Sequence, residues 1–394
     1  MEDYEAQEIE FWAKLEEEGM SRSAMLRRSA AAAFGLTVLG SSGTALAATR
    51  RFSASAAGVA GGLPALVKAA KKEGHLNTIA LPPDWANYGE IMATFQKKYG
   101  LKISNSNPNG SSAEENQAVQ SLKGNGRAPD VVDDGPAFAI SGAGQGLWAK
   151  YKNANFSTIP RSMKDTRGLW VGDYWGAISI GYNSSLISNA PKTWQDLLKP
   201  EYKGKVALNG SPLTSGSAVA GVFAAALGNG GSLNDVSAGI DFFQKLKQSG
   251  NFIPVQSTPQ TVASGQTPIS IDWDYLNLAY VKEFPAANWK VTVPADGVYG
   301  AFYCQSINAS APHPNAARLW QEFLFSDQGQ LLWLKGFSHP SRFADLSKRK
   351  VIPKGLLKVL PSAAIYAQVK FANSGQQTKA NSVISSQWPS KVGS

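Results

Sequence analysis

Short apolar runs alternate with polar loops and helical segments over residues 75–132, and this rhythm constrains the fold more than any other feature. Residues 75–81, 101–104 and 129–132 have the length and composition of strands, and residues 87–99 and 113–122 have helical spacing. Strands that alternate with helices predict βαβ units and a largely parallel sheet. Ligands of such sheets lie beyond the carboxyl ends of the strands, so the polar loops that follow the strands are where a site is expected.

A second α/β unit follows a segment of different residue composition. Residues 170–182 are aromatic and strand-like, with little helical character. Beyond them, strands are expected at 205–208 and 269–271, and helices at 218–227 and 240–248. The chain is therefore predicted to be α/β throughout, with two units.

Composition excludes several functional classes. The net charge of +9 over 394 residues is spread without a dense basic run, so nucleic-acid binding is not expected. One cysteine, Cys304, rules out an internal disulfide framework and a paired-cysteine site, and its apolar neighbours predict a buried structural thiol. His75, His313 and His339 lack metal-ligand spacing. No metal and no cofactor are expected.

The N-terminal region has the pattern of an export signal. Arg27 and Arg28 precede the apolar run 30–39 and a small-residue stretch at 45–48. We therefore expect a signal over residues 1–48, a linker and first helix over 49–74, and a periplasmic or extracellular protein. The paired arginines resemble a twin-arginine signal. The cleavage region contains no cysteine, so a lipid anchor is not expected there. An acidic leader precedes the signal, so both Met1 and Met20 remain candidate starts.

Three segments carry a family resemblance. Residues 193–206 read TWQDLLKPEYKGKV, residues 313–330 read HPNAARLWQEFLFSDQGQ, and residues 129–132 read PDVV. In this order and spacing they resemble the extracellular solute-binding proteins of ABC transporters, in the type 2 periplasmic-binding-protein branch that includes polyamine, iron, thiamine and aminoethylphosphonate binders. The aromatic and apolar residues within these segments fall at helical spacing and are expected to form core.

The resemblance implies a fold and a role. It implies two lobes, each a mostly parallel sheet flanked by helices, joined by two crossover hinge strands near residues 180–183 and 299–305. The first lobe would comprise residues 75–180 plus 303–394, and the second would comprise residues 183–299. It also implies a monomer that is not an enzyme, binds a small molecule between its closing lobes and delivers it to an ABC permease in the inner membrane.

Candidate ligand-binding residues come from the polar loops. Acids and aromatic residues would pair with an organic cation and enclose its methylenes, whereas hydroxyls ahead of helices would suit an oxyanion. The acidic and aromatic candidates are Asp84, Trp85, Tyr88, Asp134, Asp173, Trp175, Asp272, Trp273, Asp274 and Tyr299. The hydroxyl candidates are Ser111, Ser112, Thr214, Ser215 and Ser217.

Alternatives for the ligand and the function remain open at this point. The preferred ligand is a polyamine-like cation, and a phosphonate or another oxyanion is the second hypothesis. The acidic and aromatic candidates together with the hydroxyl candidates would suit a zwitterion. Ferric iron is disfavoured, because the iron binders of this branch have adjacent tyrosines near the second crossing, whereas Tyr299 and Tyr303 are separated. A different class, a secreted hydrolase, would use Asp272 and Asp274 as paired carboxylates on one strand face.

Overall fold

The computed structural model describes residues 62–358, 360 and 363–393. The expected export signal, its acidic leader and most of the expected linker lie outside these residues. Within the described part of the chain, no helix is both long and apolar enough to cross a membrane.

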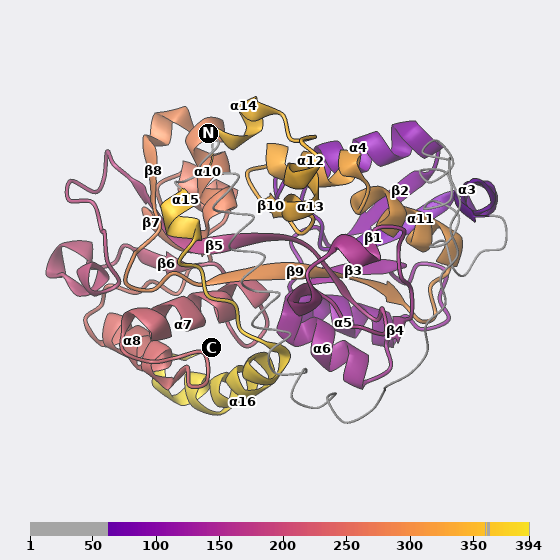
Figure 1. Ribbon diagram of the computed structural model, residues 1–394. Coiled ribbons are helices and arrows are strands. Elements are labelled where there is room, and N and C mark those ends of the chain that lie inside the picture. Colours follow the sequence, from indigo (N-terminus) through magenta and orange to yellow (C-terminus); the bar gives the residue numbers. More distant parts are fainter. Residues whose placement is uncertain (1–61, 359, 361–362, 394) are drawn as a thin grey trace, which may run out of the picture.

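The first lobe is built by the early βα units (Figure 1). Strand β1 pairs in parallel with β2, and β3 begins just beyond a contact between the Asp130 amide and the Asn77 carbonyl of β1. Helix α4 ends at Gly100, whose φ of 71° suits glycine. Its elements are α3 (Gly62–Glu73), β1 (His75–Ile79), α4 (Tyr88–Tyr99), β2 (Lys102–Ser106), α5 (Ser112–Ser121), β3 (Val131–Asp134), α6 (Pro136–Gly144) and β4 (Trp148–Ala149).

Two long antiparallel strands, β5 (Val171–Asn183) and β9 (Gly300–Asn308), connect the lobes and run through the middle of the molecule. From Val171 to Ala177, β5 pairs with β9, and from Ile178 onward it pairs with β7 and β8. The chain therefore changes neighbours at Ala177 and Ile178, a few residues before the expected crossing.

The second lobe repeats the α/β plan. Strand β6 pairs in parallel with β7, and α7 lies between the sheet and α8. A 3-10 turn over Gln195–Leu198 precedes β6. The remaining elements are β6 (Val206–Leu208), α7 (Gly216–Gly228), α8 (Ser237–Gln248), α9 (Pro259–Ala263), β7 (Ile269–Trp273), α10 (Asp274–Glu283) and β8 (Trp289–Thr292).

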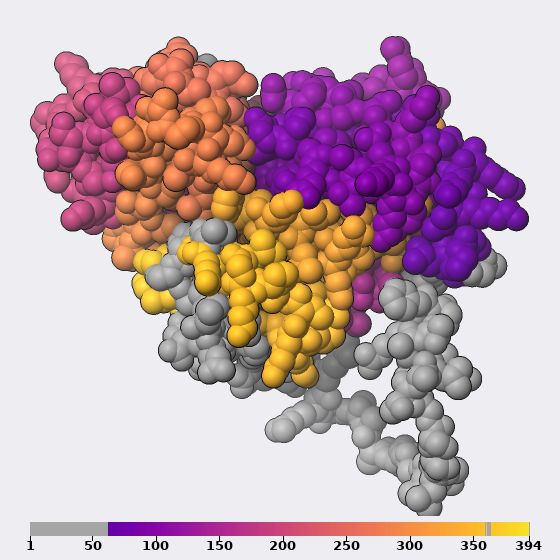
Figure 2. Space-filling view, turned by 90° about the horizontal axis from the view of Figure 1, so that it is seen from above, coloured from indigo at the N-terminus to yellow at the C-terminus, as the bar shows by residue number. Residues whose placement is uncertain are grey.

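The C-terminal residues return to the first lobe and then extend to the second. Helix α11 packs against α3, whereas α16 contacts both α6 and α8. Figure 2 shows part of the C-terminal segment, in gold to yellow, where the two halves of the molecule meet. The elements are α11 (Pro314–Leu324), α12 (Asp327–Lys335), β10 (His339–Pro340), α13 (Phe343–Lys348), α14 (Lys354–Leu357), α15 (Ala363–Tyr366) and α16 (Ser374–Lys391).

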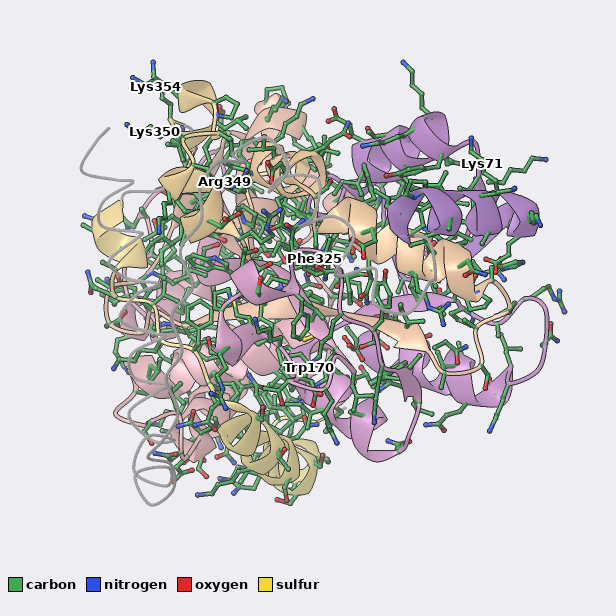
Figure 3. All side chains as sticks on the ribbon, turned by 45° about the vertical axis from the view of Figure 1, so that its right-hand side comes forward. Lys71, Trp170, Phe325, Arg349, Lys350 and Lys354 are labelled. Atoms are coloured by element: carbon green, nitrogen blue, oxygen red, sulfur yellow. The ribbon has the colours of Figure 1, made fainter. Side chains whose placement is uncertain are left out.

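The two-lobed α/β architecture expected from the sequence is confirmed, but most of the larger sheet is not parallel. Only the β1–β2 and β6–β7 ladders are parallel among the described strands, because β5 and β9 run antiparallel to the neighbours they join. The sheets are sealed by a large buried core that includes Cys304, as expected. Figure 3 places Lys71, Lys350 and Lys354 at the periphery, and all three are exposed.

Candidate functional site

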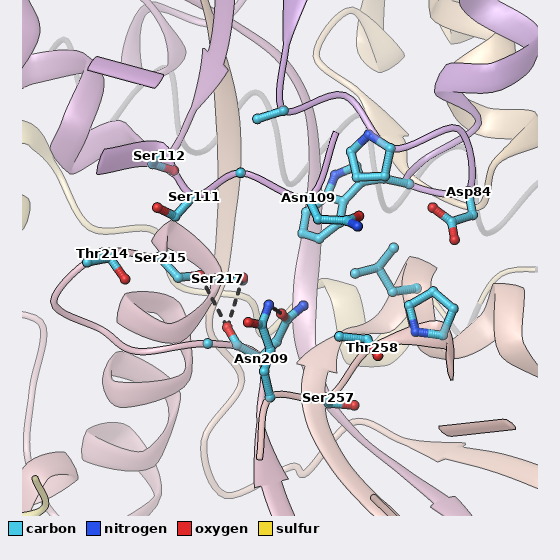
Figure 4. Close-up of a pocket in the computed structure, with 18 of the residues that line it drawn as sticks. Asp84, Asn109, Ser111, Ser112, Asn209, Thr214, Ser215, Ser217, Ser257 and Thr258 are labelled. Atoms are coloured by element: carbon cyan, nitrogen blue, oxygen red, sulfur yellow. Dashed lines mark hydrogen bonds between the residues drawn. The ribbon is translucent and has the colours of Figure 1, made fainter. Parts of the chain in front are cut away.

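A cavity of about 320 Å³ is lined by residues of both lobes (Figure 4). Its wall from the first lobe comes from the loop before α4 and from the start of α5. Its wall from the second lobe comes from the loop before α7, the start of α7 and the segment before α9. Hydroxyl and amide side chains are numerous in this wall, and among the described lining residues none is a lysine or an arginine.

The start of α5 presents an ordered polar edge to the cavity. Ser111 caps the helix by accepting a hydrogen bond from the Glu114 amide, and the Glu114 carboxylate accepts one from the Ser111 amide at 2.8 Å. These contacts with Ser111 lower the pKa of Glu114. The Ser112 hydroxyl accepts a hydrogen bond from the Gly135 amide, so its own proton remains available to donate.

The start of α7 provides the corresponding edge in the second lobe. Ser215 caps this helix by accepting from the Ala218 amide, and its hydroxyl donates to the Asn209 carbonyl at 3.2 Å. Ser217 lies in the first turn and Thr214 just before the cap, and both line the cavity. A helix start carries unpaired N–H groups and a partial positive charge. Two helices from different lobes therefore direct positive dipole ends at one cavity.

The loop before α4 supplies aromatic surface and an exposed carboxylate. The indole N–H of Trp85 donates to the Tyr174 hydroxyl at 2.7 Å, which fixes the half-buried ring against the first lobe. Tyr88, Tyr280 and Tyr303 complete the aromatic lining. Asp84 is exposed at this edge and lies away from Ser111 and Ser112 in the view of Figure 4. The cavity thus has a dipolar edge and a separate edge with an acid and aromatic rings.

Two buried acids of the first lobe also reach the cavity. The Asp133 carboxyl accepts hydrogen bonds from the hydroxyls of Tyr88 at 2.6 Å and Tyr174 at 3.1 Å. Burial nevertheless raises the pKa of Asp133 to about 7. Burial and the neighbouring carboxyls of Asp134 and Asp133 raise the pKa of Glu115 well above its ordinary value. The direction of this shift favours the protonated form of Glu115.

The two lobes touch beside the cavity. The Ala113 amide of α5 donates to the Thr214 carbonyl at 3.2 Å. Gly135, at the start of α6, packs so closely on Gly216 of α7 that a Cβ at Gly135 would lie 2.8 Å from the Gly216 Cα. The described conformation is thus one in which the helix starts of both lobes are in contact.

Eight of the fifteen candidate residues line this cavity: Asp84, Trp85, Tyr88, Ser111, Ser112, Thr214, Ser215 and Ser217. The other seven do not line it: Asp134, Asp173, Trp175, Asp272, Trp273, Asp274 and Tyr299. All seven are buried. Lining a cavity is a position and not yet a contact with a ligand, so the role of the first eight in binding stays a prediction.

The acids at the end of β7 take part in protein contacts. The Asp272 carboxyl accepts from the Asn209 side chain at 2.7 Å, so it lies behind a residue that lines the cavity. Asp274 is the first residue of α10 and accepts from the Tyr366 hydroxyl and the Ala177 amide. Because the strand ends between them, their carboxyls contact different partners and do not form a facing pair.

The remaining candidates outside the cavity are held in the protein interior. Trp175 stacks on His339 with ring centroids 4.2 Å apart, and Tyr299 stacks on Phe223 at 4.7 Å. Asp134 adjoins Asp133 on β3, where side chains of successive residues point to opposite faces. The cavity therefore takes one acid of this pair and excludes the other.

Sequence reasoning missed one whole segment of the lining. Residues Gln256, Ser257 and Thr258 lie before α9 and line the cavity, and Figure 4 shows Ser257 and Thr258 across the cavity from Ser111 and Ser112. Thr258 followed by Pro259 is a typical helix start, and this signal could have identified the segment. Other lining residues not singled out from the sequence include Asn109, Glu115, Asp133, Asn209, Tyr280 and Tyr303.

A second cavity, of about 290 Å³, lies between the second lobe and the end of α16. Its walls are mainly apolar and include Phe252, Ile253 and Trp388. It shares Gly210, Ser211 and Gln256 with the first cavity. Its polar lining residues are Ser211, Lys247 and Gln256.

Comparison with known proteins gives one family and several relatives. A family model described as bacterial extracellular solute-binding protein matches residues 128–367. A periplasmic protein of Salmonella typhimurium, named for 2-aminoethylphosphonate binding, is 29% identical over 209 residues. This alignment covers 51% of the chain and 58% of the relative, so the chain spans less than two thirds of that protein's length.

Solved structures share the fold at low sequence identity. A periplasmic binding protein of Actinobacillus pleuropneumoniae with bound fructose-6-phosphate has a TM-score of 0.66 and 18% identity, covering 81% of this chain and 98% of its own. A spermidine/putrescine-transporter substrate-binding protein of Streptococcus pneumoniae has a TM-score of 0.54 and 16% identity, covering 80% and 98%. Proteins with such different ligands share this fold, so the ligand must be inferred from the cavity itself.

Proposed function

The chain belongs to the family of bacterial extracellular solute-binding proteins, and we propose that it captures a small zwitterion with a phosphonate or related oxyanion at one end and an ammonium group at the other. Capture would take place in the cavity between the lobes, outside the inner membrane. A monomer would then deliver the ligand to the permease of an ABC importer.

The observation that carries this proposal is the convergence of two helix starts from different lobes on one cavity. Ser112 of α5 and Ser217 of α7 line it, and neither backbone amide makes a hydrogen bond to another described residue. Unpaired amides at helix starts, with hydroxyls beside them, bind oxyanions without a lysine or an arginine. A group that bridges the two starts would also hold the lobes together.

The second edge suits the other end of a zwitterion. The exposed carboxylate of Asp84 can pair with an ammonium group, and the ring of Trp85 offers an apolar face to the connecting carbons. The name of the Salmonella typhimurium relative refers to an aminophosphonate. That name agrees with the class of ligand that the cavity suits.

A polyamine remains the second candidate, because Asp84 and Glu114 are both carboxylates at the cavity. The case for it is weaker than the sequence suggested, since Asp134, Asp173 and the acids of β7 and α10 lie outside the cavity. A hydrolytic role loses its proposed acid pair for the same reason. We therefore favour binding without catalysis.

Isothermal titration calorimetry of the mature chain with four probes tests the proposal. The probes are 2-aminoethylphosphonate, ethylphosphonate, putrescine and ferric citrate. We expect 2-aminoethylphosphonate to bind most tightly, ethylphosphonate to bind more weakly, and the other two not to bind. Binding of putrescine without binding of either phosphonate would show that the cavity recognises cations. Binding of ferric citrate alone would place the protein among the iron binders.

A further inference from the structure

An acid in the wall of an anion-binding cavity needs an explanation. Glu115 lies in the first turn of α5, lines the cavity and is 2% exposed. One of its carboxyl oxygens, Oε2, accepts a hydrogen bond from the Asp133 amide at 2.9 Å. The other, Oε1, makes no hydrogen bond to any described residue. The Oε1 side of this carboxyl, at the cavity, is therefore open to a hydrogen bond with a ligand.

We propose that the carboxyl group of Glu115, in its protonated form, donates a hydrogen bond to the oxyanion of the ligand. It would replace the arginine or lysine that an anion site commonly uses. This inference rests on the proposed function, because it assumes an oxyanion at the start of α5. It also implies that ligand affinity depends on whether Glu115 is protonated.

The surroundings of Glu115 favour the protonated carboxyl. On its own helix it adjoins Glu114, and across the packing contact with β3 it meets Asp133 and Asp134. Both oxygens of Asp134 are buried without a hydrogen-bond partner. Asp173 of β5 is another buried carboxyl of the cluster, and both burial and the charge of Asp133 raise its pKa. No cationic side chain is paired with this cluster in the described part of the chain.

Electrostatics gives the direction of the effect. Ionising Glu115 would place a buried negative charge beside the carboxyls of Glu114, Asp133 and Asp134. It would also place that charge against the bound anion, so both burial and like charges oppose ionisation. A carboxylic acid in the same place supplies an O–H donor to the anion. Hydrogen bonds to charged groups are worth about 1.5–3 kcal/mol, which corresponds to roughly ten- to a hundredfold in affinity.

Two substitutions distinguish donation from acceptance. Glu115→Gln keeps the size and offers an amide N–H donor, whereas Glu115→Ala removes the donor. With 2-aminoethylphosphonate as the probe at about pH 6, we expect Glu115→Gln to bind within about threefold of the wild type and Glu115→Ala to lose roughly ten- to a hundredfold. If Glu115→Gln loses as much affinity as Glu115→Ala, the carboxyl accepts from the ligand and the proposal is wrong.

The pH profile separates a direct contact from a structural role. From about pH 6 to about pH 9, the affinity of the wild type should fall relative to that of Glu115→Gln, since only the wild type can lose the donated proton. Comparing the two proteins at each pH cancels the titration of the probe itself. A ratio that stays constant contradicts the proposal.

Controls keep the result interpretable. Glu322→Gln alters another largely buried acid, which bonds to Tyr151 and Ala154 away from the cavity, and should behave as the wild type. Melting temperatures of all variants show whether each one folds. If the folded wild type binds no oxyanion, both this inference and the proposed function fail. If it binds and the two Glu115 variants weaken equally, only this inference fails.

Discussion

A hydroxyl group at a helix start can cap the helix and can bind the ligand. A matched pair of substitutions separates these two roles. Ser215→Ala removes a cap from α7 at the cavity, and Ser326→Ala removes one from α12, where Ser326 accepts from the Gly329 amide away from the cavity. Each should lower the free energy of unfolding by about 1 kcal/mol in urea denaturation. Only Ser215→Ala should also weaken phosphonate binding, roughly three- to tenfold by calorimetry. Equal affinities would remove Ser215 from the site.

The buried acid Asp133 should make stability depend on pH. An aspartate in the unfolded chain ionises near pH 4, whereas burial raises the pKa of Asp133 in the folded protein to about 7. Between these values the folded protein holds a proton that the unfolded chain has lost. Its contribution to the free energy of unfolding is therefore complete below about pH 4 and is lost as the pH rises to about 7.

Asp133→Asn is the substitution that tests this, because an amide does not titrate in this range. The free energy of unfolding, measured by urea denaturation, should fall less from about pH 5 to about pH 7 in the variant than in the wild type. The difference between the two proteins should be at most about 1.4 kcal/mol per pH unit. Parallel losses in the two proteins would mean that Asp133 ionises normally in the fold.

The sequence was least informative about which individual acids face the cavity. It indicated that acids follow the ends of strands, and they do. It could not predict which face of a strand each acid occupies, because a shift of one residue along the strand moves a side chain from the cavity face to the interior face. Asp133 lines the cavity whereas Asp134 does not. Asp272 does not line it either, but accepts a hydrogen bond from the side chain of Asn209, which does. The hydroxyl candidates were placed better, since a cap must stand at the start of its helix.

At the scale of elements, the contact between the starts of α6 and α7 offers a direct test of closure. Gly135 has a φ of −63°, so alanine costs nothing in backbone conformation there, but its Cβ would press on Gly216. Gly135→Ala should push the helix starts apart and weaken ligand affinity roughly five- to a hundredfold. Gly144→Ala, later in α6 with open space around it, should leave affinity unchanged.

Small-angle scattering of the same two variants identifies the cause. Gly135→Ala should have a larger radius of gyration than the wild type if the lobes have opened, whereas Gly144→Ala should match the wild type. An unchanged radius together with unchanged affinity would mean that the α6–α7 contact is not needed for closure.

Most elements could be predicted from the sequence, and their pairing could not. Alternating strand and helix patterns placed β1 through α5 within a few residues, and the aromatic run became β5. Local pattern carries no information on strand direction, so the antiparallel course of β5 and β9 came only from the tertiary fold. Helix α9 was missed because five residues are too few to show a period.

The whole molecule links binding to stability. A ligand that bridges α5 and α7 binds only the folded chain, so 2-aminoethylphosphonate at about a hundred times its Kd should raise the free energy of unfolding by about 2.7 kcal/mol. Thermal denaturation with and without the probe measures this. Putrescine at equal concentration is the control, and an equal shift with putrescine would contradict an oxyanion site.

A crystal structure of the complex with 2-aminoethylphosphonate would show directly where each end of the ligand binds. The arrangement we expect places phosphonate oxygens within about 3.2 Å of donors at the starts of both α5 and α7, near Ser112 and Ser217, with the ammonium group toward Asp84. A phosphonate bound in the apolar cavity beside Trp388, or a ligand reversed so that its ammonium group meets the helix starts, would contradict it.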